Sequence, residues 1–260
     1  MEKSRFSQFL LPGEILVAGY RPVEALIKKC RVSKIWIRKG LQSKRMSTLK
    51  TKALSANIPF FILDKNSFDS IKPSGCYIDQ GIMASARSLS VYPEGELNVI
   101  LSSSSEINLL VLDGITDPYN LGACMRSAEA FGFNAVIQPK NRSASLNQSA
   151  RKASCGATEL IPLIEVTNLA RCLRWLKENN FEVIGGHSNG QPINCFVPKS
   201  SNRAVVMGSE GFGLRRITLE VCDQLVWIPT IGSTESLNVS VATGIMLYTL
   251  QQNKPNRIEI

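Results

Sequence analysis

The sequence lacks the features that mark metal sites, membrane spans and export signals. Its 260 residues contain a single histidine, His187, so a site built from several histidines is impossible. No apolar run approaches the roughly 18 residues that a membrane-spanning helix needs, and the first residues lack the apolar stretch of a secretory signal. We therefore expect no metal, no membrane association and a cytoplasmic location, with His187 on the surface or in a loop.

Cysteines are present but show no zinc or disulfide pattern. The seven of them lie at least seventeen residues apart and include no Cys-x-x-Cys pair. This spacing predicts free thiols in a reducing compartment. The cysteines are Cys30, Cys76, Cys124, Cys155, Cys172, Cys195 and Cys222.

The net positive charge of the chain lies in its first third. Residues 1–88 hold 16 of the 30 Lys and Arg residues and 6 of the 21 acidic residues, a net charge of +10, whereas residues 89–260 carry −1. Such asymmetry favours a polyanionic partner, because each neutralised phosphate releases counterions. A merely solvated charged face is the alternative.

Alternating helix and strand patterns predict two α/β domains. We place the first at residues 12–88 and the second at 107–255, joined by a linker at 89–106 that contains Tyr92-Pro93-Glu94-Gly95-Glu96 and a run of four serines. In the second domain, short apolar runs separated by helices predict a parallel sheet covered on both faces. Ligands of such sheets bind beyond the carboxyl ends of the strands.

Three loops after predicted strands hold most polar and glycine residues of the second domain. The first contains Asn120-x-Gly122-x-x-x-Arg126, with Asn120 as the expected N-cap and Gly122 allowing a close approach. The second contains Gly208-x-Glu210-x-x-Gly213, where Glu210 would repel a pyrophosphate and suits a neutral or cationic ligand.

The third loop runs from Pro229 to Ser236-Leu237-Asn238-Val239-Ser240 and leads into a long last helix. Ser236 is the expected N-cap of that helix. Small residues after it favour close packing against another backbone.

Taken together, the three loops resemble the sequence motifs of the SpoU (TrmH, or SPOUT) family of RNA ribose 2′-O-methyltransferases. The similarity is greatest to members that methylate guanosine in bacterial 23S rRNA, and it extends to Gly19–Leu26 and Gln80–Ala84 in the first domain. The resemblance implies an α/β chain in which a small L30e-like RNA substrate-binding domain precedes a trefoil-knotted methyltransferase domain. Tyr20-Arg21-Pro22 departs from the usual family pattern, which affects RNA recognition rather than methyl transfer.

The resemblance also implies a homodimer, S-adenosyl-methionine as cofactor, 23S rRNA as partner and a set of site residues. The implied catalytic residues are Asn120, Arg126, Glu210 and Asn238. The implied cofactor-binding residues are Met207, Gly208, Ile228, Pro229, Ser236 and Leu237. The residues expected to contact RNA are Arg21, Lys28, Lys29, Arg38 and Lys39.

Arg126 is the residue that the family assigns to activation of the ribose 2′-hydroxyl. A guanidinium stays protonated in proteins and is a poor base, so we expect Arg126 to bind phosphate and stabilise the developing alkoxide, with proton acceptance as the contested option. Asn120 and Asn238 would orient the ribose and the loops, and Glu210 would fix Arg126 or a neighbouring amide. The alternatives are a tRNA ribose methyltransferase, a catalytically silent RNA-binding protein and a nicotinamide-dependent oxidoreductase, although the last lacks the dinucleotide fingerprint.

Overall fold

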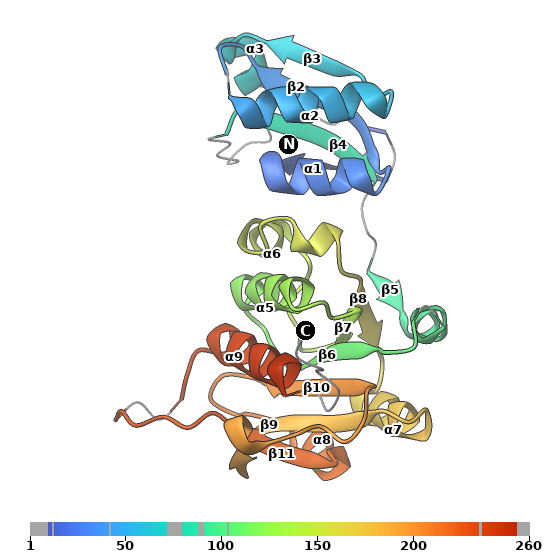
Figure 1. The fold of residues 1–260 in the computed structure, drawn as a ribbon, viewed down its shortest axis with the longest axis vertical. Coiled ribbons are helices and arrows are strands. Elements are labelled where there is room, and N and C mark those ends of the chain that lie inside the picture. The colour runs from blue at the N-terminus through green and yellow to red at the C-terminus, as the bar shows by residue number, and fades with distance from the viewer. Residues whose placement is uncertain are drawn as a thin grey trace, which may run out of the picture. The chain divides into compact units, whose positions relative to one another are not determined.

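In a computed structural model, the chain divides into two compact units, residues 1–89 and 90–260 (Figure 1). The structure describes residues 10–11, 13–41, 43–71, 80–87, 91–102, 104–233 and 236–253. Both units are α/β, as the sequence predicts.

The first unit is a four-stranded mixed sheet with helices on both faces. Its strands are ordered β1-β4-β2-β3; β4 is antiparallel to both neighbours, and β2 is parallel to β3. Ile35 and Ile37 of β2 point into the core shared with α1 and α2, whereas Trp36 between them packs with Phe68 of α3. The elements are β1 (Glu14–Ala18), α1 (Tyr20–Lys28), β2 (Val32–Arg38), α2 (Lys44–Ser55), β3 (Phe60–Leu63), α3 (Lys65–Ser70) and β4 (Ile82–Arg87).

The second unit is a seven-stranded sheet whose recorded strand pairs are all parallel, in the order β11-β9-β10-β6-β7-β8-β5. Its strands are β5 (Tyr92–Pro93), β6 (Asn108–Asp113), β7 (Ala135–Pro139), β8 (Leu163–Val166), β9 (Glu182–Pro192), β10 (Arg203–Gly208) and β11 (Gln224–Trp227). Its α-helices are α4 (Leu97–Leu101), α5 (Pro118–Ala130), α6 (Gln148–Ala153), α7 (Leu169–Glu178), α8 (Arg216–Val221) and α9 (Val239–Gln252).

Both faces of this parallel sheet are covered, which confirms the prediction from its apolar strands. Leu110 and Leu112 of β6 pack into a core with α5, α6 and α9, and Leu109 and Val111 of the same strand pack into a second core with α4, α7 and α8. Because side chains of a strand alternate between faces, a strand buried on both sides is apolar throughout. Figure 1 shows the helices on the two sides of the sheet.

The segment predicted as a linker, residues 89–106, is partly folded into the second unit. Tyr92 pairs with Ile164 of β8, and Leu97 of α4 is buried against the sheet. The serine and glycine content of this segment suggested a linker, but its apolar residues at 97, 100 and 101 pack onto the same core as α7. The described division of the chain lies between Leu89 and Ser90.

Strand order places a crevice at the carboxyl ends of β6 and β10. These strands are neighbours in register, with Gly208 opposite Asp113, although 95 positions separate their partners along the chain. From β6 the chain runs outward through β7 and β8, and the later strands lie on the other side of β6. Ligands of open α/β sheets bind at such a reversal of strand order.

Candidate functional site

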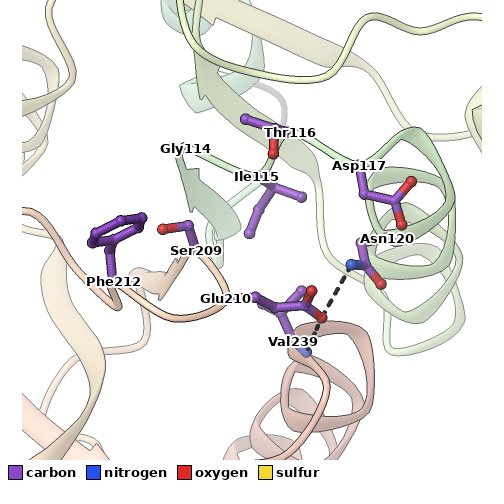
Figure 2. Close-up of a pocket in the computed structure, with 9 residues that line it drawn as sticks. All are labelled: Gly114, Ile115, Thr116, Asp117, Asn120, Ser209, Glu210, Phe212 and Val239. Carbon is purple, nitrogen blue, oxygen red and sulfur yellow. Dashed lines mark hydrogen bonds between the residues drawn. The ribbon is translucent and has the colours of Figure 1, made fainter.

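A small cavity lies where the loops after β6 and β10 meet the start of α9 (Figure 2). Its volume is about 200 Å³, below the roughly 300–1,000 Å³ of pockets that enclose a whole drug-sized ligand. The cavity therefore fits a part of a substrate or cofactor rather than all of it. It is lined by Gly114, Ile115, Thr116, Asp117, Asn120, Ser209, Glu210, Phe212 and Val239.

Glu210 joins all three sequence motifs through one carboxylate oxygen. Its Oε1 accepts hydrogen bonds from Asn120 Nδ2 at 3.1 Å, from Asn238 Nδ2 at 2.6 Å and from the backbone N–H of Val239 at 3.3 Å. Asn238 Nδ2 also donates to Asn120 Oδ1 at 3.1 Å. We call Asn120, Glu210 and Asn238 the amide–carboxylate cluster. Three of the four predicted catalytic residues thus meet at one point (Figure 2 shows Asn120 and Glu210).

The loop after β10 is a tight hairpin that presents Glu210 to the cavity. Ser209 and Gly213 exchange two backbone hydrogen bonds of 3.0 and 2.9 Å. A Cβ atom at Gly208 would collide with the backbone of Gly213 and Leu214, so this position requires glycine. The glycine spacing of the second motif therefore serves a close backbone approach.

Two predicted helix caps lie elsewhere than expected. α5 begins after Asp117, whose side chain accepts from Tyr119 N, and Pro118 occupies the first helical position, where a missing N–H costs nothing. Asn120 is therefore inside the first turn and free to face Glu210. Similarly, Asn238 caps α9 by accepting from Ser240 N at 3.0 Å, and Ser236 is exposed before it.

Arg126 does not belong to this cluster within one chain. Six residues separate it from Asn120 on α5, which is about 600° of helical rotation and leaves the two side chains about 120° apart around the axis. Its Nη1 lies 3.4 Å from Cys155 Sγ, and its side chain is outside the cavity lining. Of the two partners expected for Glu210, Arg126 or a neighbouring amide, the structure shows amides, because Glu210 accepts hydrogen bonds from Asn120 and Asn238.

The six expected cofactor-binding residues lie at the carboxyl ends of β10 and β11 and just before α9. Met207 and Gly208 end β10, Ile228 and Pro229 follow β11, and Ser236 and Leu237 precede α9. None of the six is among the described residues that line the cavity. Met207 is buried and Ile228 packs on the core.

Sequence reasoning missed an ion pair that anchors the hairpin. Asp113 at the end of β6 is buried and accepts hydrogen bonds from Arg215 N at 3.0 Å and from Arg215 Nε at 2.6 Å. A buried carboxylate is stable only when it is paired in this way. The sequence feature that could have revealed this ion pair is Asp113 directly after the apolar run 109–112.

A second missed pattern is Gly186-His187-Ser188-Asn189-Gly190, which has the Gly-x-Ser-x-Gly spacing of a hydrolase nucleophile elbow. Such an elbow is a sharp turn between a strand and a helix. Here the five residues form an irregularity inside β9, because the pairing with β11 jumps from Gly185 to Gln191. His187 Nδ1 accepts from Asn189 N at 3.1 Å, so this pattern forms an irregular stretch of strand and no elbow.

The cysteines are free thiols where the structure describes them, and Cys76 lies outside the described residues. Burial raises the pKa of Cys124 on α5 to about 11, with a hydrogen bond to Thr243 of α9 opposing the shift.

Among the described residues, no group of three His, Cys, Asp or Glu side chains is arranged to hold a metal ion. No helix in the described part of the chain has the length and apolar character of a membrane span.

Four of the five residues expected to contact RNA form two separate pairs in the first unit. Lys28 and Lys29 end α1, and we call them the α1-end pair; Arg38 and Lys39 end β2, and we call them the β2-end pair. β2 starts next to the α1-end pair and, at about 3.3 Å per residue, puts the pairs about 20 Å apart. The side chain of Arg21 lies outside the described residues, although its backbone belongs to α1.

Comparison with known proteins gives a consistent result for both units. Residues 108–248 match the family model described as "SpoU rRNA Methylase family", and residues 16–92 match "RNA 2'-O ribose methyltransferase substrate binding". The 23S rRNA (guanosine-2'-O-)-methyltransferase RlmB of Escherichia coli K12 is 43% identical over 235 residues, which cover 90% of this chain and 96% of that protein. RlmB of Yersinia pestis is 42% identical over 92% of this chain and 97% of its own length.

Solved structures share the fold at low sequence identity. The SpoU methyltransferase AviRb from Streptomyces viridochromogenes, in complex with AdoMet, superposes with a TM-score of 0.70 at 22% identity, covering 92% of this chain and 90% of that one. An AdoMet-bound rRNA methyltransferase from Sinorhizobium meliloti gives a TM-score of 0.68 at 20% identity over 92% of this chain and 87% of its own. The family model covers more than half of the chain, and its three motifs meet at the cavity. This chain belongs to the SpoU rRNA methylase family.

Proposed function

We propose that this protein transfers a methyl group from S-adenosyl-methionine to the 2′-hydroxyl of a guanosine in 23S rRNA. The observation that supports this function most strongly is the amide–carboxylate cluster, in which one residue from each of the three family motifs contacts the others. The 43% identity to RlmB over nearly its whole length supports the rRNA substrate over tRNA. The proposal includes a cytoplasmic location, which an rRNA substrate supports.

The chemistry of the cavity fits a cationic methyl donor. Its charged lining residues are Asp117 and Glu210, and no Lys or Arg is among the described residues that line it. S-adenosyl-methionine supplies, when bound, a methyl group on a positively charged sulfur. Met207, Gly208, Ile228, Pro229, Ser236 and Leu237 would hold it, largely through the backbone. The backbone crowding at Gly208 leaves no space for a side chain there, which suits a loop that holds a ligand by main-chain groups.

Within this proposal, the amide–carboxylate cluster positions the ribose, and Arg126 stabilises the negative charge on the phosphate and on the attacking oxygen. Asn120 and Asn238 orient the loops and the sugar, with Glu210 fixing both amides. Arg126 binds the phosphate next to the target and stabilises the developing alkoxide while the hydroxyl proton passes to solvent water. Alignment of the oxygen with the methyl group supplies most of the acceleration.

The position of Arg126 supports a homodimer in which each cavity uses an arginine from the partner copy. Arg126 points away from its own cavity, so it would reach a second one across an interface. α9 offers an apolar face for such an interface, because Val241, Ile245 and Tyr248 are 51%, 37% and 53% exposed and spaced on one side of the helix. No residue of α9 is charged. The proposal also includes the trefoil knot that the family resemblance implies.

The first unit would dock folded rRNA through phosphate contacts of its basic pairs. Such contacts give affinity and orientation but no sequence information. Choice of the nucleotide then depends on groups near the cavity.

A direct test is methylation in vitro with labelled S-adenosyl-methionine and either 23S rRNA or total tRNA. We expect label in the 2′-O position of guanosine in 23S rRNA, read as an alkali-resistant dinucleotide. Label in tRNA alone would contradict the substrate, and no transfer by a sample that is folded and binds RNA would favour the silent RNA-binding alternative.

A further inference from the structure

Phe212 is a large apolar side chain left almost wholly in solvent at the rim of the cavity. It is 94% exposed and lines the cavity together with Ser209, Glu210 and Asn120. Figure 2 shows its ring on the side of the cavity opposite Asp117 and Asn120. Exposed aromatic residues are normal when scattered singly, so its place at this rim is what calls for an explanation.

The hairpin closes the backbone around Phe212 into a defined turn. Gly211 and Gly213 on either side have positive φ angles of 84° and 64°, and the Ser209–Gly213 hydrogen bonds close the turn. Beyond the turn, Leu214 is buried and Arg215 is bonded to Asp113. Because this loop is already closed, the binding of a ligand against the ring costs little loop conformational entropy.

The geometry of a nucleotide brings its base within reach of this ring. The base is attached to the sugar carbon next to the one that bears the 2′-hydroxyl. If that hydroxyl lies beside Asn120 and Glu210, the base of the same nucleotide lies one bond further along the sugar, at the cavity rim. The acidic lining disfavours a phosphate there, whereas a base presents an uncharged face.

We propose that Phe212 is a stacking platform for the purine base of the nucleotide that is methylated, and so a residue that sets substrate affinity. This inference rests on the proposed function. Sequence-specific RNA recognition commonly stacks unpaired bases on aromatic side chains. Stacking on one face tolerates any base, so Phe212 contributes affinity and orientation, and hydrogen bonds elsewhere select guanine.

The test is a mutant cycle between Phe212 and the base. Phe212→Ala, Phe212→Leu and Phe212→Trp are compared on an RNA with the intact target and on the same RNA made abasic at the methylated nucleotide, with binding followed by fluorescence anisotropy. Phe212→Ala should weaken binding of intact RNA by about 5- to 150-fold, the range found when a stacking aromatic residue is removed. The same substitution should leave binding of abasic RNA unchanged. Phe212→Trp should bind at least as tightly as wild type, and Phe212→Leu should resemble Phe212→Ala.

Controls separate this role from the other uses of the loop. Val197→Ala removes a side chain that is 57% exposed and outside the cavity lining, and it should bind RNA as the wild type does. Weaker S-adenosyl-methionine binding by Phe212→Ala in calorimetry would assign the ring to the adenine of the cofactor and overturn the inference. A change of oligomeric state in sedimentation would assign the ring to a subunit contact and also overturn it. An equal loss of binding affinity for intact and abasic RNA in Phe212→Ala would also overturn the inference. Failure of the wild type to methylate RNA would instead count against the proposed function itself.

Discussion

Replacing Asn238 by aspartate tests the amide–carboxylate cluster with the exchange of one nitrogen for one oxygen. Asn238 Oδ1 caps α9, and its Nδ2 donates to Glu210 Oε1 at 2.6 Å and to Asn120 Oδ1 at 3.1 Å. Aspartate is as good an N-cap as asparagine, so Asn238→Asp keeps the start of α9. It replaces two donated hydrogen bonds by a carboxylate that faces another carboxylate.

The size of the effect follows from the hydrogen bond that is lost. A hydrogen bond to a charged group contributes about 1.5–3 kcal/mol, which corresponds to a loss of about 10- to 150-fold in kcat/KM at about 1.4 kcal/mol per tenfold. Like charges at hydrogen-bond distance raise the pKa of the pair, because both cannot ionise together. One proton shared by the pair restores a donor. Activity of Asn238→Asp should therefore rise as the pH falls from about 8 to about 5.5, opposite to any loss of wild-type activity over that range.

The assay is methyl transfer to 23S rRNA at several pH values, with thermal unfolding measured on the same samples. Asn168→Asp is a matched control, because Asn168 caps α7 by accepting from Arg171 N at 3.0 Å and its amide nitrogen has no recorded partner among the described residues. It should retain full activity. Wild-type activity of Asn238→Asp at pH 8, or a loss that does not depend on pH, would refute the role assigned to the cluster.

Three further predictions follow from the site and the first unit. Arg126→Ala should lower kcat by about 10²- to 10³-fold and leave S-adenosyl-methionine binding in calorimetry nearly unchanged; loss of both would indicate a structural role. Alanine at the α1-end pair and at the β2-end pair should each raise the KM for RNA and flatten its salt dependence, and the effects should multiply because the pairs lie about 20 Å apart; an unchanged salt slope would exclude phosphate contacts. Burial raises the pKa of Cys124 to about 11 and that of Cys172 to about 12, so iodoacetamide at pH 8 should label the exposed Cys30, Cys155 and Cys195 first, as read by peptide mass spectrometry. Rapid labelling of Cys124 in the folded protein would contradict its placement between α5 and α9.

Hydrophobic patterns predicted most of the fold because burial on both faces of a strand shows directly in the sequence. β6 and β10 were evident for this reason, and so were the positions of the loops that follow them. β1 was not predicted, because Glu14–Ala18 is half-buried and has no strong alternation. The helix caps were misplaced by up to three residues, since the side chains of Asp117 and Asn238 are as suitable for capping as those of Asn120 and Ser236.

The site was predicted in part, and the missing parts depend on long-range geometry. The family resemblance implied Asn120, Glu210 and Asn238 as site residues, but only the register of β6 against β10 makes one carboxylate reach both amides. Helical periodicity already separates Arg126 from Asn120 around α5. The exposure of Phe212 depends on how the hairpin turns, which the glycine spacing alone does not determine.

The central claim is tested most directly by mapping 2′-O-methyl groups on 23S rRNA from cells that lack this protein. The account predicts that one guanosine loses its methyl group and regains it when the wild-type protein is restored, but not when Arg126→Ala is restored. A 23S rRNA methylation map identical to that of the parent cells would contradict it.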